Sequence, residues 1–254
     1  MLTLIAESKT MKSCGRVLSE DDLRQHRPLF DKSADEIMAR LGTMSVQELC
    51  AALKVSTPMA QKIKQMAYEF PNKRVGLRAV DAFTGVVFRA LDYPTLSAEA
   101  QEYLSDNLGI ISSVYGWLDA DDDVKQYRME FGALCSPDGK ALTSFWRDRV
   151  TDALLDRLSA GGHTAVIDLC PGDATRCIDR KRVEPYAIVI KVNFTSSDGT
   201  VKSPHANRLK TLRGQLLRQI AIHGISTPEE LAELSTDDFF PLPTSDPFQL
   251  LFRC

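Results

Sequence analysis

No stretch of 18 apolar residues occurs in this 254-residue chain, which excludes a membrane-spanning helix. The first twelve residues hold an apolar stretch of only five, Leu2 to Ala6, which predicts a first strand and not a signal peptide. Internal repeats, low-complexity segments and long linkers are also missing. Because 44% of the residues are hydrophobic, the chain can bury a large core, and we expect one domain over residues 1–254.

Several chemical signatures are absent as well. The six cysteines are scattered without a C-x-x-C pair, a pattern typical of reduced thiols in the cytoplasm rather than of disulfides or a zinc site. The four histidines form neither H-x-H nor H-E-x-x-H, and no P-loop or Ser-His-Asp pattern occurs. Paired Glu and His at i, i+3, as in di-iron bundles, are missing too. We therefore expect a cytoplasmic protein with no metal and no cofactor.

Short apolar segments between turn residues predict the strands of a sheet, interleaved irregularly with amphipathic helices. This order predicts an α+β fold in which helices cover a mixed, partly barrel-like sheet. Residues 143–159 should form a helix that packs Trp146, Val150 and Leu154 on the sheet, and residues 197–199 should close a hairpin. The predicted strands are Leu2–Ala6, Leu77–Phe83, Val86–Leu91, Ile110–Tyr115, Tyr127–Phe131, His163–Cys170, Tyr186–Thr195 and Phe248–Arg253.

Capping patterns locate the starts of several helices. Ser33, Ser45 and Thr227 each stand three residues before a glutamate, which is the spacing of a capping box. Pro58 follows Thr57 at the first turn of another predicted helix. These signals make residues 33–70 a helical segment and a candidate subdomain within the larger domain.

Positive charge is concentrated near the C-terminus of a chain whose net charge is −3. Residues 201–225 hold five basic side chains and no acid, whereas residues 226–254 hold six acids and one base. This distribution predicts a localised anion-binding cleft and argues against a protein coated in nucleic acid.

Arg213 is the unusual residue of this basic segment. From Asn207 onward, apolar residues recur at the spacing of one helix face, and Arg213 falls inside that stripe. An unpaired buried guanidinium costs several kcal/mol, so the side chain needs a partner. Two interpretations remain open: Arg213 pairs with a carboxylate to stabilise the fold, or it faces a cleft where an anion, foremost phosphate, binds. The stripe consists of Leu209, Leu212, Leu216 and Ile220.

Two short predicted helices, residues 45–53 and 58–70, are joined by residues 54–57. This string resembles a helix–hairpin–helix, which presents hairpin amides and a helix N-terminus to one DNA phosphate. Because Ser56 and Pro58 stand where glycine is common, an ordinary packing corner of two helices is the alternative. The predicted phosphate contacts are Lys54, Ser56, Thr57, Lys62 and Lys64.

Short motifs follow one another in a recognisable order along the whole chain. Lys9-Thr10 matches part of an Ala-Lys-Thr-Leu element, residues 82–85 are similar to Ala-Phe-Lys-Gly, and residues 111–118 and 127–132 give the longest match. Arg213-Gly214 with Arg218 matches an Arg-Gly-x-x-x-Arg helix, and Lys210 a lysine before it. This ordered set resembles the YaaA family of bacterial peroxide-stress proteins.

The resemblance implies a cytosolic α+β protein that limits damage by hydrogen peroxide. Because free iron converts peroxide into DNA-breaking radicals, it also implies links to iron homeostasis and to DNA, through a basic cleft and a helix–hairpin–helix. Residues 119–123 form an acidic loop that would repel phosphate unless it faces elsewhere. Five positions depart from the family pattern and put its site chemistry in question: Thr84, Asp119, Asp168, Pro171 and Ala174.

The candidate cleft residues come from separate segments. Arg128 and Glu130 should share one face of a strand, and with Arg213 they would form a phosphate clamp oriented by Glu130 or Asp168. A structural Arg128–Glu130 pair is the alternative. Tyr115 either stacks on a base or lies in the core, and Cys170 and Cys177 are either peroxide-responsive or inert. The cleft set is Lys9, Thr10, Tyr115, Gly116, Arg128, Glu130, Lys210, Arg213, Gly214 and Arg218.

Two functions compete. The leading hypothesis is a binding protein without catalytic residues that contacts duplex or distorted DNA during peroxide stress. The alternative is an enzyme acting on a nucleotide or another phosphorylated small molecule. An open groove lined by the basic residues would favour the polymer, whereas a closed pocket with a buried carboxylate beside Arg213 would favour the small molecule.

Overall fold

A seven-stranded mixed sheet forms the centre of the protein. The computed structural model describes residues 1–254 except 14, 18, 20–24, 73–74 and 197–203. The strand order is β5-β4-β1-β7-β8-β10-β9, and a second sheet has the order β2-β3-β6. The strands are β1 Leu2–Ala6, β2 Arg16–Val17, β3 Val75–Arg78, β4 Leu108–Ser112, β5 Gly116–Asp119, β6 Asp123–Val124, β7 Ala165–Asp168, β8 Ile188–Thr195, β9 Phe240–Leu242 and β10 Gln249–Arg253.

Five central strands of the main sheet are mutually parallel, and the edge strands β5 and β9 run antiparallel to their neighbours. The chain passes from β1 to β4 on one side, then crosses to β7 on the other side and continues to β8 and β10. The direction of winding therefore reverses at β1. In open sheets of parallel strands, ligands bind beyond the carboxyl ends at such a reversal, here between β1 and β7.

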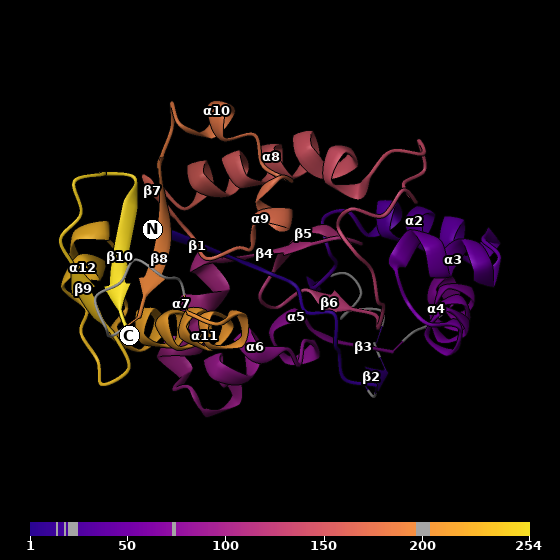
Figure 1. Ribbon diagram of the computed structural model, residues 1–254, viewed down its shortest axis with the longest axis horizontal. Helices are drawn as coiled ribbons and strands as arrows, with labels where there is room; N and C mark the ends of the chain where they lie inside the picture. Colours follow the sequence, from indigo (N-terminus) through magenta and orange to yellow (C-terminus); the bar gives the residue numbers. More distant parts are fainter. Residues whose placement is uncertain (14, 18, 20–24, 73–74, 197–203) are drawn as a thin grey trace.

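Helices cover both faces of the main sheet. Figure 1 shows α8 and α10 on one face and α6, α7 and α11 on the other. Helix α8 buries Trp146, Val150 and Leu154 as the sequence pattern predicts. The helices named so far and their neighbours are α5 Ala79–Ala82, α6 Val86–Leu91, η2 Tyr93–Thr95, α7 Ala98–Asn107, α8 Leu142–Ala160, α9 Gly172–Thr175, α10 Arg180–Val183, α11 Ala206–His223 and α12 Pro228–Glu233.

Three further helices, α2 Asp31–Thr43, α3 Val46–Leu53 and α4 Thr57–Glu69, project at one end of the molecule, with η1 Phe70–Asn72 after them (Figure 1). Helix α2 buries Ala34, Ile37, Met38 and Leu41, residues spaced three or four apart, on one face. Helices α2 and α4 pack on each other, as do α3 and α4. Whether this segment folds as a unit of its own stays a prediction.

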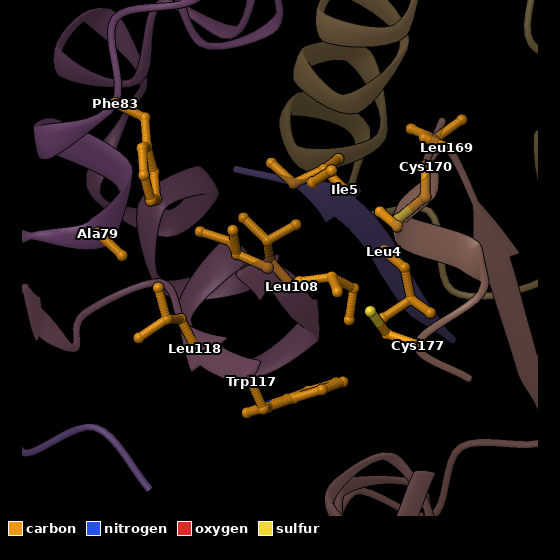
Figure 2. Close-up of a cluster of buried hydrophobic side chains, with 14 of the residues drawn as sticks. Leu4, Ile5, Ala79, Phe83, Leu108, Trp117, Leu118, Leu169, Cys170 and Cys177 are labelled. Atoms are coloured by element: carbon orange, nitrogen blue, oxygen red, sulfur yellow. The ribbon is translucent and has the colours of Figure 1, made fainter. Parts of the chain in front are cut away.

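The core is built around β1, whose five residues are all buried because sheet strands flank it and helices cover it. Figure 2 shows Leu4 and Ile5 among side chains from β4, β5 and the segment after β7, with Trp117 lying across the cluster. Trp146 of α8 is also fully buried and covers Gly116, where an added Cβ would lie 2.5 Å from the indole. Aromatic packing thus joins α8 to the sheet.

The predicted α+β class and mixed sheet are confirmed, as are the capping boxes at Ser45 and Thr227. Over the described residues the main sheet ends at β5 and β9 and does not close into a barrel. The capping box at Ser33 is wrong, because α2 already begins at Asp31. The predicted turn at residues 197–199 lies outside the described residues, and both described neighbours of β8 are parallel to it.

Three predicted strands are wrong in whole or part. Residues 86–91 form helix α6, which packs on α11 and buries Phe88 and Leu91. The segment Leu77–Phe83 is divided, since β3 ends at Arg78 and α5 follows. Residues 127–131 pair with no described strand; Tyr127 and Met129 are buried, so the apolar alternation is genuine, but it arises in an extended loop.

Candidate functional site

A pocket of about 470 Å³ lies beyond the carboxyl ends of β1 and β7, where the winding of the sheet reverses. The residues after β1 and after β7 form two of its walls, and the start of α6, residues 129–131 and α11 form the others. The polar and charged residues that line it are Glu7, Ser8, Lys9, Thr10, Arg89, Glu130, Asp173, Lys210 and Arg213.

The loop after β1 is held by local hydrogen bonds. Thr10 N donates to Ser8 Oγ at 3.1 Å, and the two hydroxyls lie 3.1 Å apart. Thr84 N donates to Thr10 O at 2.9 Å, so the segments of residues 8–10 and 82–85 lie together at the pocket. The two family-like motifs, far apart in the sequence, therefore build one wall.

Lys9 and Glu130 form an ion pair with 2.5 Å between Nζ and Oε2. Arg128 Nη1 donates to Lys9 O at 3.0 Å, and Arg128 is not among the residues that line the pocket. Glu130 is thus neutralised by Lys9 and not by Arg128. The structure brings Lys9, Thr10, Glu130, Lys210 and Arg213 to one pocket and leaves Arg128 behind its wall.

Arg213 reaches the pocket because α11 crosses α6 closely. An added Cβ on Gly214 would lie 2.2 Å from Val87 O, so only glycine permits this approach. The Nε of Arg213 is buried and has no hydrogen-bond partner, and its guanidinium forms no ion pair with any residue that the structure describes. Burial lowers the pKa of Arg213, which Cys170, Asp168 and Asp173 oppose. Of the two interpretations, the ion-paired one is absent from the described structure.

Three other candidates have structural partners. Arg218 Nη1 donates to Leu91 O at 2.8 Å and to Asp92 O at 2.9 Å, capping the end of α6. Tyr115 is buried against Phe70 and Tyr127, and its hydroxyl accepts a bond from Lys125 N at 3.1 Å. Tyr115 and Gly116 therefore belong to the core, which was the alternative for Tyr115.

Among the polar pocket residues absent from the predicted set, which are Glu7, Ser8, Arg89 and Asp173, Glu7 has the most unusual surroundings. Its carboxylate accepts hydrogen bonds from Ser113 N at 3.0 Å, from Ser113 Oγ and from the Tyr127 hydroxyl. Burial raises the pKa of Glu7 to about 7, although these hydrogen bonds act in the opposite direction. A carboxylate directly after a buried strand was the available signal, but only the strand order shows that β1 ends at the reversal.

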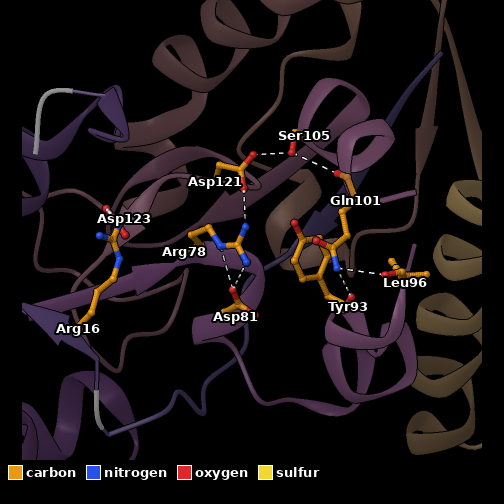
Figure 3. Close-up of polar contacts among 9 residues, drawn as sticks. All are labelled: Arg16, Arg78, Asp81, Tyr93, Leu96, Gln101, Ser105, Asp121 and Asp123. Carbon is orange, nitrogen blue, oxygen red and sulfur yellow. Dashed lines mark hydrogen bonds and ion pairs between the residues drawn. The ribbon is translucent and has the colours of Figure 1, made fainter. Parts of the chain in front are cut away.

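The acidic loop of residues 119–123 lies outside the pocket. Figure 3 shows Asp121 beside Arg78 and Ser105, with Arg78 Nη1 3.5 Å from Asp121 Oδ1. Asp119 pairs with Arg157 at 3.3 Å, and Asp123 with Arg16 at 2.9 Å. Burial raises the pKa of Asp122 to about 7. The departure at Asp119 therefore places no negative charge among the residues that line the pocket.

The helix–hairpin–helix candidate, α3 with α4, lies at the far end of the molecule (Figure 1). Lys54 ends α3 with a φ of 52°, and Ser56 is the N-cap of α4 without a side-chain capping bond. Lys64 Nζ donates to Met44 O at 2.6 Å, whereas Lys54, Thr57 and Lys62 are exposed. None of the five candidate residues lines the pocket.

Redox and metal chemistry find little support in the described part of the chain. Cys170 and Cys177 are buried, and burial raises the pKa of both thiols, that of Cys177 to about 12, so neither is a reactive thiolate. The described residues contain no group of three His, Cys, Asp or Glu side chains that would hold a metal ion. Among the helices of those residues, none is long and apolar enough to cross a bilayer.

Comparison with known proteins identifies relatives of this chain. A family model described as "Peroxide stress protein YaaA" matches residues 1–241. A UPF0246 protein of Bacteroides thetaiotaomicron is 32% identical over 257 residues, covering 99% of this chain and 98% of the relative. A UPF0246 protein of Clostridium perfringens is 28% identical, covering 94% and 93% of the two chains. The chain therefore belongs to the YaaA family of peroxide stress proteins.

Proposed function

We propose that this peroxide-stress family member binds a phosphorylated small molecule, of the size of a nucleotide, in the pocket between β1 and β7. The observation that carries the proposal is the guanidinium of Arg213, which lines the pocket and has a buried Nε without a partner among the described residues. Leaving such a donor unpaired costs free energy, and a phosphate oxygen is the acceptor that a guanidinium binds best.

The remaining pocket walls fit a ligand with a phosphate and an apolar body. Lys210 stands one helical turn before Arg213 and is exposed, so it can approach a phosphate from the solvent side. The volume of about 470 Å³ is within the usual range of small-molecule sites, roughly 300–1,000 Å³. The apolar lining includes Ile5, Val87, Met129, Phe131 and Leu169.

The arrangement of basic residues favours a small molecule over a polymer at this pocket. Arg218 of the predicted groove and Lys64 of the predicted helix–hairpin–helix contacts donate to backbone carbonyls instead. The exposed Lys54 and Lys62 belong to the turn after α3 and to α4, helices at the far end of the molecule (Figure 1). A buried carboxylate, Glu7, shares the pocket with Arg213. These are the features expected of the closed pocket rather than of the open groove.

The test is calorimetric titration of the full chain with nucleoside monophosphates and diphosphates, at two salt concentrations. Wild type should bind at least one of them with micromolar affinity, and Arg213→Gln should weaken that affinity about 100-fold, or close to 3 kcal/mol. Lys62→Ala is the matched control, a cation lost outside the pocket, and should leave the affinity unchanged. Equal affinities of wild type and Arg213→Gln would overturn the proposal.

A second candidate is the DNA contact that family membership suggests, together with the limiting of iron-dependent peroxide damage in the cytoplasm. The supporting observation is the exposed turn between α3 and α4, which carries Lys54 and, one turn into α4, Lys62. Duplex binding at low salt should weaken several-fold in Lys54→Ala/Lys62→Ala and remain in Arg213→Gln. If Arg213→Gln loses duplex binding and Lys54→Ala/Lys62→Ala keeps it, DNA binds at the pocket. If wild type does not bind duplex DNA, this candidate function is wrong.

A further inference from the structure

A chain of hydrogen bonds with a fixed direction ends on Glu7. The backbone amides of Val114 and Tyr115 donate to Ser112 Oγ at 3.2 and 3.0 Å. Because amides only donate, they lie on the acceptor side of this hydroxyl, which leaves its own hydrogen for the Tyr127 oxygen, 2.7 Å away, or for Glu7. The Tyr127 hydrogen is then left for Glu7 Oε2. Every donor in the chain is thus directed toward the carboxylate.

The carboxylate of Glu7 is the acceptor at this end of the pocket. An ionised carboxylate has about four lone-pair positions, two on each oxygen. Oε2 accepts from Ser113 N and Tyr127, and Oε1 accepts from Ser113 Oγ. Glu7 lines the pocket and forms no ion pair with any described residue, so the acceptor capacity that these hydrogen bonds leave unused is available to a ligand.

Other charged groups face Glu7 from each surrounding element. The cations at the pocket are Lys9, which pairs with Glu130, Arg89, whose Nη1 donates to Thr84 O, and Lys210 with Arg213 on α11. The acids are Glu130 and Asp173, and Cys177 and Tyr127 are the neighbouring groups with raised pKa values. Since Lys9 and Arg89 have protein partners, the pocket cations whose described surroundings leave them open to a ligand are Lys210 and Arg213, and Glu7 is the carboxylate without an ion pair there.

We propose that Glu7 is an acid–base residue, which accepts a proton from an N–H or O–H group of the phosphorylated ligand held by Arg213. The step is balanced within the pocket: the X–H bond of the ligand breaks, its electrons stay on X, and the proton forms the O–H bond of the Glu7 carboxylic acid. The substrate class is therefore a phosphate ester that also carries an N–H or O–H donor. The assignment rests on the proposed function, because Arg213 positions that ligand.

A Glu7 pKa of about 7 suits this role, because both protonation states are then populated near neutral pH. Tyr127 and Ser113 are positioning residues. Each donates to the carboxylate and lowers the pKa of Glu7 against the opposing effect of burial. Removing either hydroxyl should therefore raise the pKa of Glu7 further.

The experiment measures the affinity of the full chain for the tightest-binding nucleoside monophosphate between pH 6 and pH 8. The ratio of wild-type affinity to that of Glu7→Gln cancels the effect that ionisation of the ligand has on both affinities. Because the ligand donor requires the ionised carboxylate, this ratio should rise roughly tenfold over the range, with its midpoint near pH 7. Asp122→Asn is the matched control, since the pKa of Asp122 is also raised to about 7 but Asp122 lies outside the pocket. The ratio of wild-type affinity to that of Asp122→Asn should not change with pH.

Tyr127→Phe should move the midpoint to higher pH, which a merely structural tyrosine would not do. If Glu7→Gln fails to fold, the ratio of wild-type affinity to that of Tyr127→Phe still cancels the ionisation of the ligand and should change between pH 6 and pH 8. A flat or falling ratio, or an unmoved midpoint in Tyr127→Phe, would overturn the role of Glu7 while Arg213-dependent binding persists. Absence of any Arg213-dependent nucleotide binding would overturn the proposed function, and this inference with it.

Discussion

The pocket beyond β1 and the acidic loop after β5 both gather charged residues, but they satisfy them differently. In the acidic loop, Asp119 and Asp121 meet Arg157 and Arg78, and Figure 3 shows side chains directed at one another. At the pocket, Arg213 and Glu7 form no ion pair with any described residue, although both are largely removed from solvent.

In the proposed function, this difference separates charges that pair within the fold from charges that bind a ligand. A cluster of like charges drew attention to residues 119–123 in the sequence, yet Asp119, Asp121 and Asp123 pair with arginines, and Asp122 accepts a hydrogen bond from Asp119 N. A single arginine on an apolar stripe was the better signal, because burying an unpaired charge is tolerated only where something compensates it. The two regions can be tested against each other by mutation.

The largest expected effect concerns the pH dependence of stability. Burial raises the pKa of Glu7 from 4.5 to about 7, so between these values the folded chain holds a proton that the unfolded chain has lost. Stability from Glu7 is therefore fully present below about pH 4.5 and is lost as pH rises through 7, by about 3 kcal/mol at most. Denaturation curves from pH 4.5 to pH 8 should show this slope reduced in Glu7→Gln.

Asp122 sharpens that prediction, because burial in the acidic loop raises its pKa to about 7. Its contribution to stability therefore also falls as the pH rises. Asp122→Asn should remove a comparable part of the slope of stability against pH. The double variant Glu7→Gln/Asp122→Asn should remove both parts. Nucleotide, added in excess, should change the Glu7 share alone. An unchanged slope in Glu7→Gln would contradict the buried state of this carboxyl.

Gly214→Ala should have the next largest effect. Its Cβ would meet Val87 O, so α11 and α6 must separate, at a cost of about 2 kcal/mol in the free energy of unfolding. The shift also carries Arg213 away from the pocket, so nucleotide affinity should fall. Gly132→Ala is the matched control, because an added Cβ there would meet no atom within 4 Å. Gly139 also has open space, but its φ of 76° would strain an alanine. If Gly214→Ala is as stable as wild type, α11 and α6 do not approach each other as closely as described.

The smallest effect is expected on the paired side of the comparison. Arg78→Gln removes the ion pairs with Asp81 at 2.9 Å and with Asp121, and the Arg78 side chain is 41% exposed. Stability should fall by about 1 kcal/mol or less, as for other partly exposed pairs. Nucleotide affinity should stay at the wild-type value. A loss of affinity would show that the acidic loop and the pocket are coupled.

Sequence reasoning reached the fold class, β1, helix α8, the buried stripe of α11 and the family, because periodicity and motif order are local properties. It failed at residues 86–91 and 127–131, where apolar alternation or β-branched residues occur outside a strand. It missed Glu7, since the role of a residue after β1 depends on which strands lie beside it. The structural contacts of Tyr115 and Arg218 likewise depend on distant partners, which lie 10 residues away in the sequence for Tyr115 and 127 residues away for Arg218.

The most direct test is nucleotide titration and denaturation of Arg213→Gln and Arg78→Gln side by side. We expect opposite outcomes for the two arginines. Arg213→Gln should lose nucleotide affinity about 100-fold while its stability stays equal or rises, because an unpaired buried charge is removed. Arg78→Gln should lose stability and keep its affinity. Destabilised Arg213→Gln with wild-type affinity would contradict the claim that Arg213 is held for a ligand.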